Sequence, residues 1–289
     1  MTDVERQIQS LDSAMAIFWQ RIPVLIRALV SGFLIAEIGI AAWLVVWAFV
    51  PAPWSIVVMS GLLWLYCKYL SGSWWPKATA AARRDRFRAV KLPAGVWRWS
   101  LVAAMLFVVI AQSGLVITFR LIEFPAEAFT AGYNVDAMPL WLVWPSILMA
   151  SLVAGICEET GLRGYLQVPL ERRYGPGVGI TIASIVFVLI HLNQAWAPTV
   201  LLHLFAWSVL WGILAYAAGS LIPSIIGHAV MDVFNFSYWW TDIAGRFEMQ
   251  TLAETGVDSH FVGWSLGFAA SIALFFWATR KIMAVRQLT

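Results

Sequence analysis

Charged residues are scarce in this 289-residue sequence, where they make up 12% of the chain, whereas an ordinary soluble domain has about 25%. Hydrophobic residues make up 61%. Apolar stretches of at least about 18 residues recur along the chain, and each could cross a hydrocarbon core of roughly 30 Å as a helix. The composition therefore excludes an ordinary soluble domain and predicts an all-α, polytopic bundle of membrane helices.

The sequence also has few cysteines and lacks the features of a cleaved signal peptide. The two cysteines, Cys67 and Cys157, lie in apolar segments and lack CxxC spacing, so they indicate neither a redox pair nor a zinc knuckle. The N-terminal stretch lacks the basic start, short apolar core and cleavage site of a signal peptide. We expect it to stay on the mature protein.

The basic residues sort by loop and predict the topology. About eight helices are expected, an even number that puts both termini on one side. All basic residues except Arg120 and Arg246 fall on that side, which assigns it to the cytoplasm of a multi-pass membrane protein. The net charge of +3 then reflects topology, and the basic, Trp-flanked loop at 71–100 is expected to contact lipid, not nucleic acid. The expected helices lie near 25–50, 54–71, 100–118, 140–168, 177–196, 199–218, 221–237 and 263–282.

Ionisable side chains within the expected spans are the informative residues, because each costs about 2.5–3.5 kcal/mol at a helix centre. Glu158 and Glu159 are adjacent in the fourth span, and Arg163 follows Glu159 by four residues. Glu159 and Arg163 therefore share a helix face and can pair. Glu158 points about 100° away from that pair and has no obvious cation nearby.

The fifth span places His191 opposite Glu158. From the turn that joins the two spans, Glu158 lies 13 residues back and His191 lies 14 residues forward. In an antiparallel hairpin of straight helices, both would lie roughly 20 Å from the turn. This matched depth is what a shared site requires.

A third wall is expected from the segment that begins near Pro223. His228, Asp232 and Asn235 fall at i, i+4 and i+7 on one face of this helix. Histidines and carboxylates in one bundle could hold a zinc ion, with Glu158, His191 and His228 as candidate ligands, or could activate a water without a metal. The sequence leaves both choices open, so the cofactor is either absent or a divalent metal.

Three motifs in this order resemble the CAAX-protease and bacteriocin-processing family, which includes the Rce1-type prenyl-protein endoproteases. EETGLR fits EExxxR, FVLIH fits FxxxH, and HAVMD fits HxxxN or HxxxD. The resemblance implies an eight-span protease, like the bacterial members in a plasma (inner) membrane, in which Glu158 and His191 activate the attacking water. It also implies that His228 and Asp232 stabilise the oxyanion. From their spacing alone, Glu159, Arg163 and Asn235 are expected as supporting residues.

The resemblance divides the chain into three parts. Residues 1–139 would supply three N-terminal spans and the basic loop, 140–237 the catalytic core, and 238–289 an outer loop and the last span. The expected partners are the lipid bilayer and a membrane-associated peptide or protein, prenylated or not. An ionised Asp232 would repel an oxyanion, so this residue must be protonated, orient His228 or bind a metal, and Asn235 is an alternative amide donor.

A non-enzyme is the competing hypothesis. The same carboxylates could serve an ion-coupled transporter, or the chain could be a degenerate scaffold or immunity protein. A transporter with inverted repeats would show related halves, which the sequence lacks. Glu37 is expected to be a packing residue, and His203 is expected to lie at the membrane interface.

Overall fold

The computed structural model describes residues 17–123, 138–192, 198–239, 241, 243–244 and 250–288, and these contain helices but no strand. The predicted all-α class is confirmed. The long helices are α2 (Val24–Phe49), α3 (Trp54–Leu70), α5 (Ala94–Leu121), α7 (Leu140–Glu158), α9 (Pro176–Ile190), α10 (Pro198–Ala218), α11 (Ile222–Phe234) and α13 (Ser259–Arg286). The short ones are η1 (Lys77–Thr79), α4 (Ala80–Phe87), α8 (Val168–Tyr174) and α12 (Leu252–Thr255), and two π-helical segments are η2 (Glu159–Gln167) and η4 (Asn235–Trp239).

Five of the described helices are long and apolar enough to cross a membrane, which makes this a multi-pass membrane protein. They are α2, α5, the continuous segment Leu140–Tyr174, the Thr199–Ala218 part of α10, and α13. Helices α3 and α9 are apolar but shorter. The count of eight crossings and the cytoplasmic placement of the termini stay predictions. Arg246, which was predicted to lie in a loop on the opposite side, is outside the described residues.

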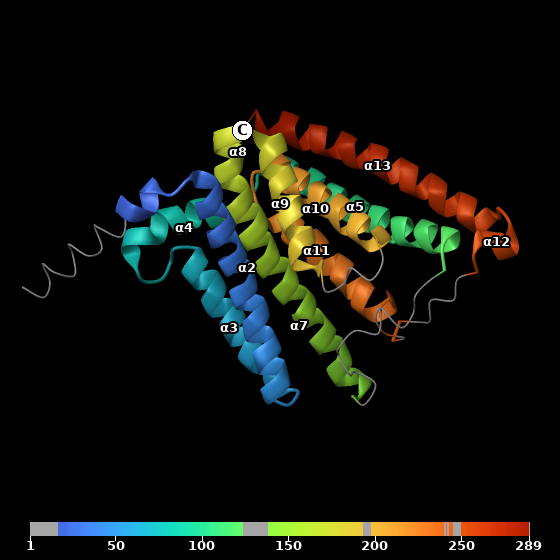
Figure 1. The fold of residues 1–289 in the computed structure, drawn as a ribbon, viewed down its shortest axis with the longest axis horizontal. Coiled ribbons are helices and arrows are strands. Elements are labelled where there is room, and N and C mark those ends of the chain that lie inside the picture. The colour runs from blue at the N-terminus through green and yellow to red at the C-terminus, as the bar shows by residue number, and fades with distance from the viewer. Residues whose placement is uncertain are drawn as a thin grey trace, which may run out of the picture.

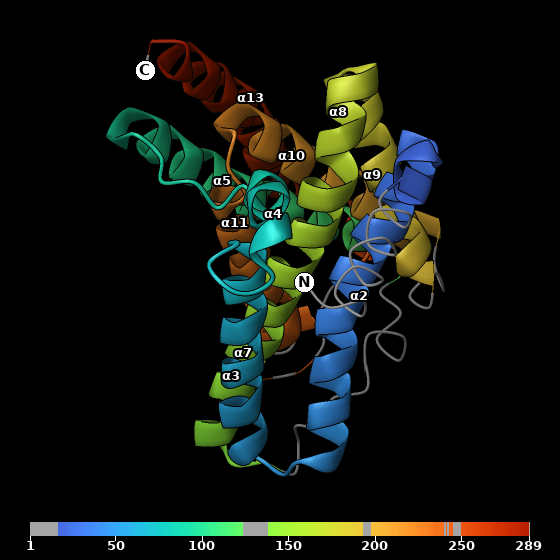
Figure 2. The ribbon, with the colours of Figure 1, turned by 90° about the vertical axis from the view of Figure 1, so that its left-hand side faces the viewer.

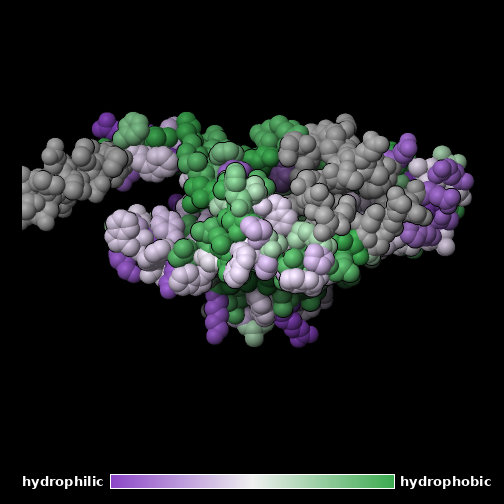
Figure 3. Space-filling model, turned by 90° about the horizontal axis from the view of Figure 1, so that it is seen from below, coloured by the Kyte–Doolittle hydropathy of each residue, from purple (hydrophilic) through white to green (hydrophobic). Residues whose placement is uncertain are grey.

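The helices form two groups that meet at α9, α10 and α11. The axes of α2, α3 and α7 are roughly aligned, whereas α5 and α13 lie side by side at an angle to them (Figure 1). Figure 2, turned by 90°, shows α2 and α3 as an antiparallel pair joined at one end. On the face in Figure 3, hydrophobic residues spread across the middle and hydrophilic residues gather near the margins.

The predicted helices differ from the observed ones in several places. Helix α5 begins at Ala94, not near 100, because Pro93 presets the backbone for a helix start ahead of the basic residue Arg98. Helix α9 ends at Ile190, before the predicted 196, and the next residue, His191, caps it with φ −105° and ψ 16°. The segment predicted as one helix over 221–237 changes from α to π at Asn235.

The basic loop also makes protein contacts that the lipid interpretation did not foresee. Arg83 is buried and donates hydrogen bonds to the carbonyl oxygens of Tyr69, Trp74 and Pro76. Asp85 on α4 accepts two hydrogen bonds of 2.7 Å from Arg172 on α8, and these hold the pKa of Asp85 below its usual range. The loop is thereby docked on the segment that follows the EExxxR motif.

Arg120, predicted to lie in an opposite loop, is instead the buried last-turn residue of α5. Its guanidinium donates to both carboxylate oxygens of Asp258, at 3.2 and 2.7 Å, and to the hydroxyl of Thr255. Asp258 caps the N-terminus of α13, and the hydrogen bonds from Arg120 lower its pKa. This cluster fixes one end of the α5–α13 pair.

Small residues let α2 cross the motif segment at backbone contact. A Cβ atom at Gly161 would lie 2.5 Å from the carbonyl oxygen of Gly32 and 2.7 Å from the Cβ of Ala36. One at Gly39 would lie 2.1 Å from the Sγ of Cys157. Small residues at such spacing are how membrane helices pack closely, and here they bring α2 against the residues that flank Glu158.

Gly161→Ala is expected to lower the stability of the protein by about 1–3 kcal/mol, the usual cost of overpacking. The added methyl group would meet backbone atoms of α2, which cannot move aside as a flexible side chain would. Thermal unfolding in detergent measures the effect. Gly61→Ala is the matched control, because a Cβ there meets nothing within 4 Å. Equal melting temperatures for the two variants would contradict the close crossing.

Candidate active site

The two adjacent carboxylates lie where the helix changes its winding. Glu158 is the last residue of α7, and Glu159 begins the π-helical segment η2. Such π-helical turns are rare and frequently occur at functional sites. Glu158 and Glu159 are both buried, so the segment carries two carboxylates inside the bundle.

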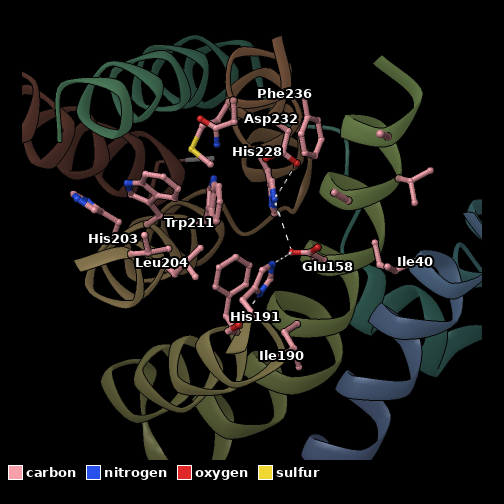
Figure 4. A pocket seen from close by; sticks show the side chains of 18 of the residues that line it. Ile40, Glu158, Ile190, His191, His203, Leu204, Trp211, His228, Asp232 and Phe236 are labelled. Atoms are coloured by element: carbon pink, nitrogen blue, oxygen red, sulfur yellow. Dashed lines mark hydrogen bonds and ion pairs between the residues drawn. The ribbon is translucent and has the colours of Figure 1, made fainter. Parts of the chain in front are cut away.

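Four ionisable side chains converge from three helical segments, as the sequence analysis expected. Oε2 of Glu158 lies 4.0 Å from Nε2 of His191 and 3.9 Å from Nε2 of His228 (Figure 4). Nε2 of His228 also lies 3.5 Å from Oδ2 of Asp232. These distances exceed a direct hydrogen bond of about 2.7–3.2 Å. The groups thus face a common point without binding one another.

The His191 ring is oriented by its own helix end. Its Nδ1 lies 2.8 Å from the carbonyl oxygen of Phe187, and its ring packs on that of Phe187 with centroids 4.3 Å apart. A carbonyl oxygen only accepts, so the hydrogen lies on Nδ1. The Nε2 atom therefore presents a lone pair toward Glu158 when the ring is neutral.

The His228 ring is fixed by a carboxylate and an aromatic face. Its Nδ1 lies 3.1 Å from Oε1 of Glu159, and the ring stacks on Trp211 with centroids 4.0 Å apart and 12° between the planes. With Nδ1–H donated to Glu159, Nε2 is the atom that faces Glu158 and Asp232.

Arg163 holds Glu159 in place, and both side chains have no exposed surface. Its Nε lies 3.6 Å from Oε2 of Glu159, which confirms the predicted i, i+4 pair. It also donates to the carbonyl and hydroxyl oxygens of Ser208 and lies over the rings of Phe187 and Trp211. The topology argument counted Arg163 with the basic residues of the cytoplasmic side; the structure places it as a buried residue of η2, and the side of the membrane stays a prediction.

The charged site opens on a cavity of about 490 Å³ lined mainly by apolar and aromatic residues. Asn235 lines it, as its expected helix face implies. Glu37, expected only to pack, also lines the cavity from α2. His203 also lines the cavity, with Nε2 2.7 Å from the hydroxyl oxygen of Thr118. Its predicted place at the membrane interface stays a prediction.

The sequence analysis missed Gln112, a polar residue near the middle of α5. Gln112 donates a hydrogen bond of 3.2 Å to Oδ1 of Asn235 and accepts one of 2.7 Å from Nε1 of Trp239. An amide inside a long apolar span was the available signal, but it carries no charge and belongs to none of the three motifs.

Within the described part of the chain, no group of three or more His, Cys, Asp or Glu side chains could hold a metal ion. The candidate zinc ligands Glu158, His191 and His228 do face one another, but we assign no reaction step to a metal.

Residues 139–234 match the family model described as type II CAAX prenyl endopeptidase Rce1-like. The chain carries an Rce1-like segment. The resemblance drawn from the three motifs is confirmed, since EExxxR, FxxxH and HxxxD all fall within the matched residues. Neither the curated proteins nor the solved structures gave a match. The Rce1-like segment supports an intramembrane endopeptidase in general, whereas the role of each side chain is a separate question.

Arg163→Met is expected to destabilise the protein by about 3–5 kcal/mol, because it leaves the buried Glu159 charge without its cation. Unfolding of the detergent-solubilised protein by sodium dodecyl sulfate gives the free-energy difference. Arg172→Met is the matched control, since its ion pair with Asp85 is partly exposed, with 56% of the Arg172 side chain accessible, and such pairs contribute under about 1 kcal/mol.

A second comparison separates lost charge pairing from lost packing. Adding Glu159→Gln to Arg163→Met removes the orphaned charge and is expected to recover part of the stability. Equal unfolding of Arg163→Met and Arg172→Met would show that the buried pair is not a main support of the site.

Proposed function

We propose that this chain is an intramembrane endopeptidase that hydrolyses a peptide bond of a membrane-associated protein or peptide with water activated by Glu158 and His191. The observation that carries the proposal is the convergence of Glu158 Oε2 with Nε2 of His191 and of His228, at 4.0 and 3.9 Å, on the wall of a large cavity. A positioned carboxylate and imidazole are the groups that general-base hydrolysis needs. The Rce1-like segment adds independent support for the reaction class.

In the proposed reaction, the oxygen of the water attacks the carbonyl carbon of the scissile bond. Its proton moves to Oε2 of Glu158, with Nε2 of His191 as the second acceptor, since its lone pair faces the same point. When the tetrahedral intermediate collapses, the C–N bond breaks and this proton passes to the leaving nitrogen, which gives a carboxylic acid and an amine. One water is consumed, and the acid then gives its proton to the amine, so the products are a carboxylate and an ammonium group.

His228 is the proposed donor to the oxyanion. Its Nδ1–H is bound to Glu159, whose negative charge favours a ring that carries hydrogens on both nitrogens. An Nε2–H in a water-poor cavity, held by stacking on Trp211, is already oriented for charge that develops in the transition state.

Asp232 is proposed to act in its protonated form. Its Oδ2 lies beside Nε2 of His228, in the same wall of the cavity, where an ionised carboxylate would repel the oxyanion. A protonated carboxyl group instead donates its O–H, as an asparagine amide at this motif position would donate its N–H.

Glu158→Gln and His191→Ala are expected to abolish proteolysis while the protein still inserts and folds, because each removes a group that accepts the water proton. The measurement is quantitative mass spectrometry of new peptide termini in membranes that carry the wild-type protein or one variant. Glu254→Gln, in the exposed capping box of α12, is the matched control and should give the wild-type pattern.

If the new peptide termini are equally abundant in membranes with the wild-type protein and with Glu158→Gln, the protease proposal is contradicted. Proton- or ion-coupled transport by the same carboxylates would then become the better hypothesis, and solute flux in proteoliposomes would test it.

Asp232→Asn is expected to keep proteolysis near the wild-type rate, because the amide supplies a permanent donor at the same position. Asp232→Leu keeps the branched arrangement of four side-chain heavy atoms without any donor, and its kcat should fall by about 100-fold, as when one oxyanion donor is removed. Rates of cleavage of a substrate found in the terminal-peptide comparison provide the measurement. A dead Asp232→Asn variant would indicate that the carboxylate itself is required and would reject the donor role.

A further inference from the structure

A chain of hydrogen bonds runs from Trp239 through Gln112 to Asn235, beside the cavity that His228 also lines. Nε1 of Trp239 donates to Oε1 of Gln112 at 2.7 Å, and Nε2 of Gln112 donates to Oδ1 of Asn235 at 3.2 Å. The three residues come from α5 and η4, and none belongs to the motifs that carry the proposed chemistry. Asn235 and Trp239 line the cavity, whereas Gln112 is behind them.

The first donor fixes the direction of every amide in this chain. An indole nitrogen can only donate, so Gln112 must present its oxygen to Trp239 and its nitrogen to Asn235. Asn235 must in turn present its oxygen to Gln112. Its Nδ2 and both attached hydrogens are left over, and no described residue accepts a hydrogen bond from them.

The remaining amide nitrogen belongs to a largely buried residue of the cavity wall, so a ligand that covers it must offer an acceptor. Asn235 is only 7% exposed and lines the cavity. Burying an amide donor without an acceptor costs on the order of 1–3 kcal/mol. A chain of three polar side chains whose one free donor faces the cavity is therefore built like a ligand-binding element, since apolar packing would need none of them.

The distance along α11 indicates which ligand group this donor meets. Asn235 follows His228 by seven residues, a rise of about 10 Å on an α-helix, and an extended peptide advances roughly 3.3 Å per residue. We propose that Asn235 Nδ2 binds a backbone carbonyl of an extended substrate about three residues from the scissile bond, with Gln112 and Trp239 as positioning residues. This inference rests on the proposed function and adds a binding subsite to it.

The test uses a quenched fluorescent peptide that spans the first cleavage site mapped in the terminal-peptide comparison. Asn235→Ala is expected to lower kcat/KM by about 10-fold, close to the effect of one lost hydrogen bond, mainly through KM. Gln112→Glu keeps the shape and the contact with Trp239 but sets a carboxylate oxygen against Oδ1 of Asn235. The Asn235 amide must then turn round, and a similar loss is expected.

A double variant distinguishes positioning from general packing. If Gln112 acts through Asn235, adding Gln112→Glu to Asn235→Ala lowers kcat/KM no further, whereas a purely structural role multiplies the two losses. Gln287→Glu, at the exposed end of α13, is the control and should match the wild type. Peptide Kd values measured in the Glu158→Gln background should rise about 10-fold with Asn235→Ala.

A scan of the substrate locates the bound carbonyl. Replacing one peptide bond at a time with an ester weakens the carbonyl acceptor, and the proposal expects one position, about three residues from the scissile bond, to weaken binding to the wild type but not to Asn235→Ala. Wild-type efficiency in Asn235→Ala or Gln112→Glu, or multiplied losses in the double variant, would overturn the subsite. Failure of the protease proposal itself would look different, because cleavage would then be the same in Glu158→Gln as in the wild type.

Discussion

The site depends on one buried ion pair between Glu159 and Arg163. Neither side chain has any exposed surface, and such charges are tolerated in a bundle only when each is paired. Arg163 also reaches Ser208 on α10 and covers the rings of Phe187 and Trp211. The pair therefore joins the π-helical segment to α9 and α10. It also fixes the position of the Glu159 carboxylate, which binds Nδ1 of His228.

A second constraint brings α2 to the same segment. The crossing of Gly32 and Ala36 against Gly161 works only because those residues are small, and it leaves Glu37, Ile40 and other α2 residues as one wall of the cavity. The charged pair connects η2 to α10, and the small-residue crossing connects it to α2. Together they fix the segment that begins directly after Glu158.

The four converging residues could be predicted from the sequence because each is an ionisable group within an apolar span, where its burial costs free energy unless it has a partner or a function. Its depth count from the hairpin turn placed Glu158 opposite His191, and the structure has them 4.0 Å apart, although the count assumed straight helices and passed over the π-helical segment. The helix bounds around Arg98 and His191 were wrong, since hydropathy does not show where a proline starts a helix or where a helix end frays. Gln112 was missed because its importance lies in a contact 123 residues away in sequence, which no local pattern records.

Helix α11 and its π-helical extension combine two kinds of polar group on one wall. His228 and Asp232 lie nearest the carboxylates, where charge would develop during hydrolysis, whereas Asn235 lies a turn further on and is uncharged. This difference in charge along the wall has a chemical reason. A group that stabilises a transition state benefits from charge. A group that only binds the ground state of a peptide needs a donor of fixed direction, because tighter binding there would raise affinity without raising kcat. On the proposed roles, the change from α to π winding at Asn235 falls between the residues assigned to the chemistry and the residue assigned to substrate binding.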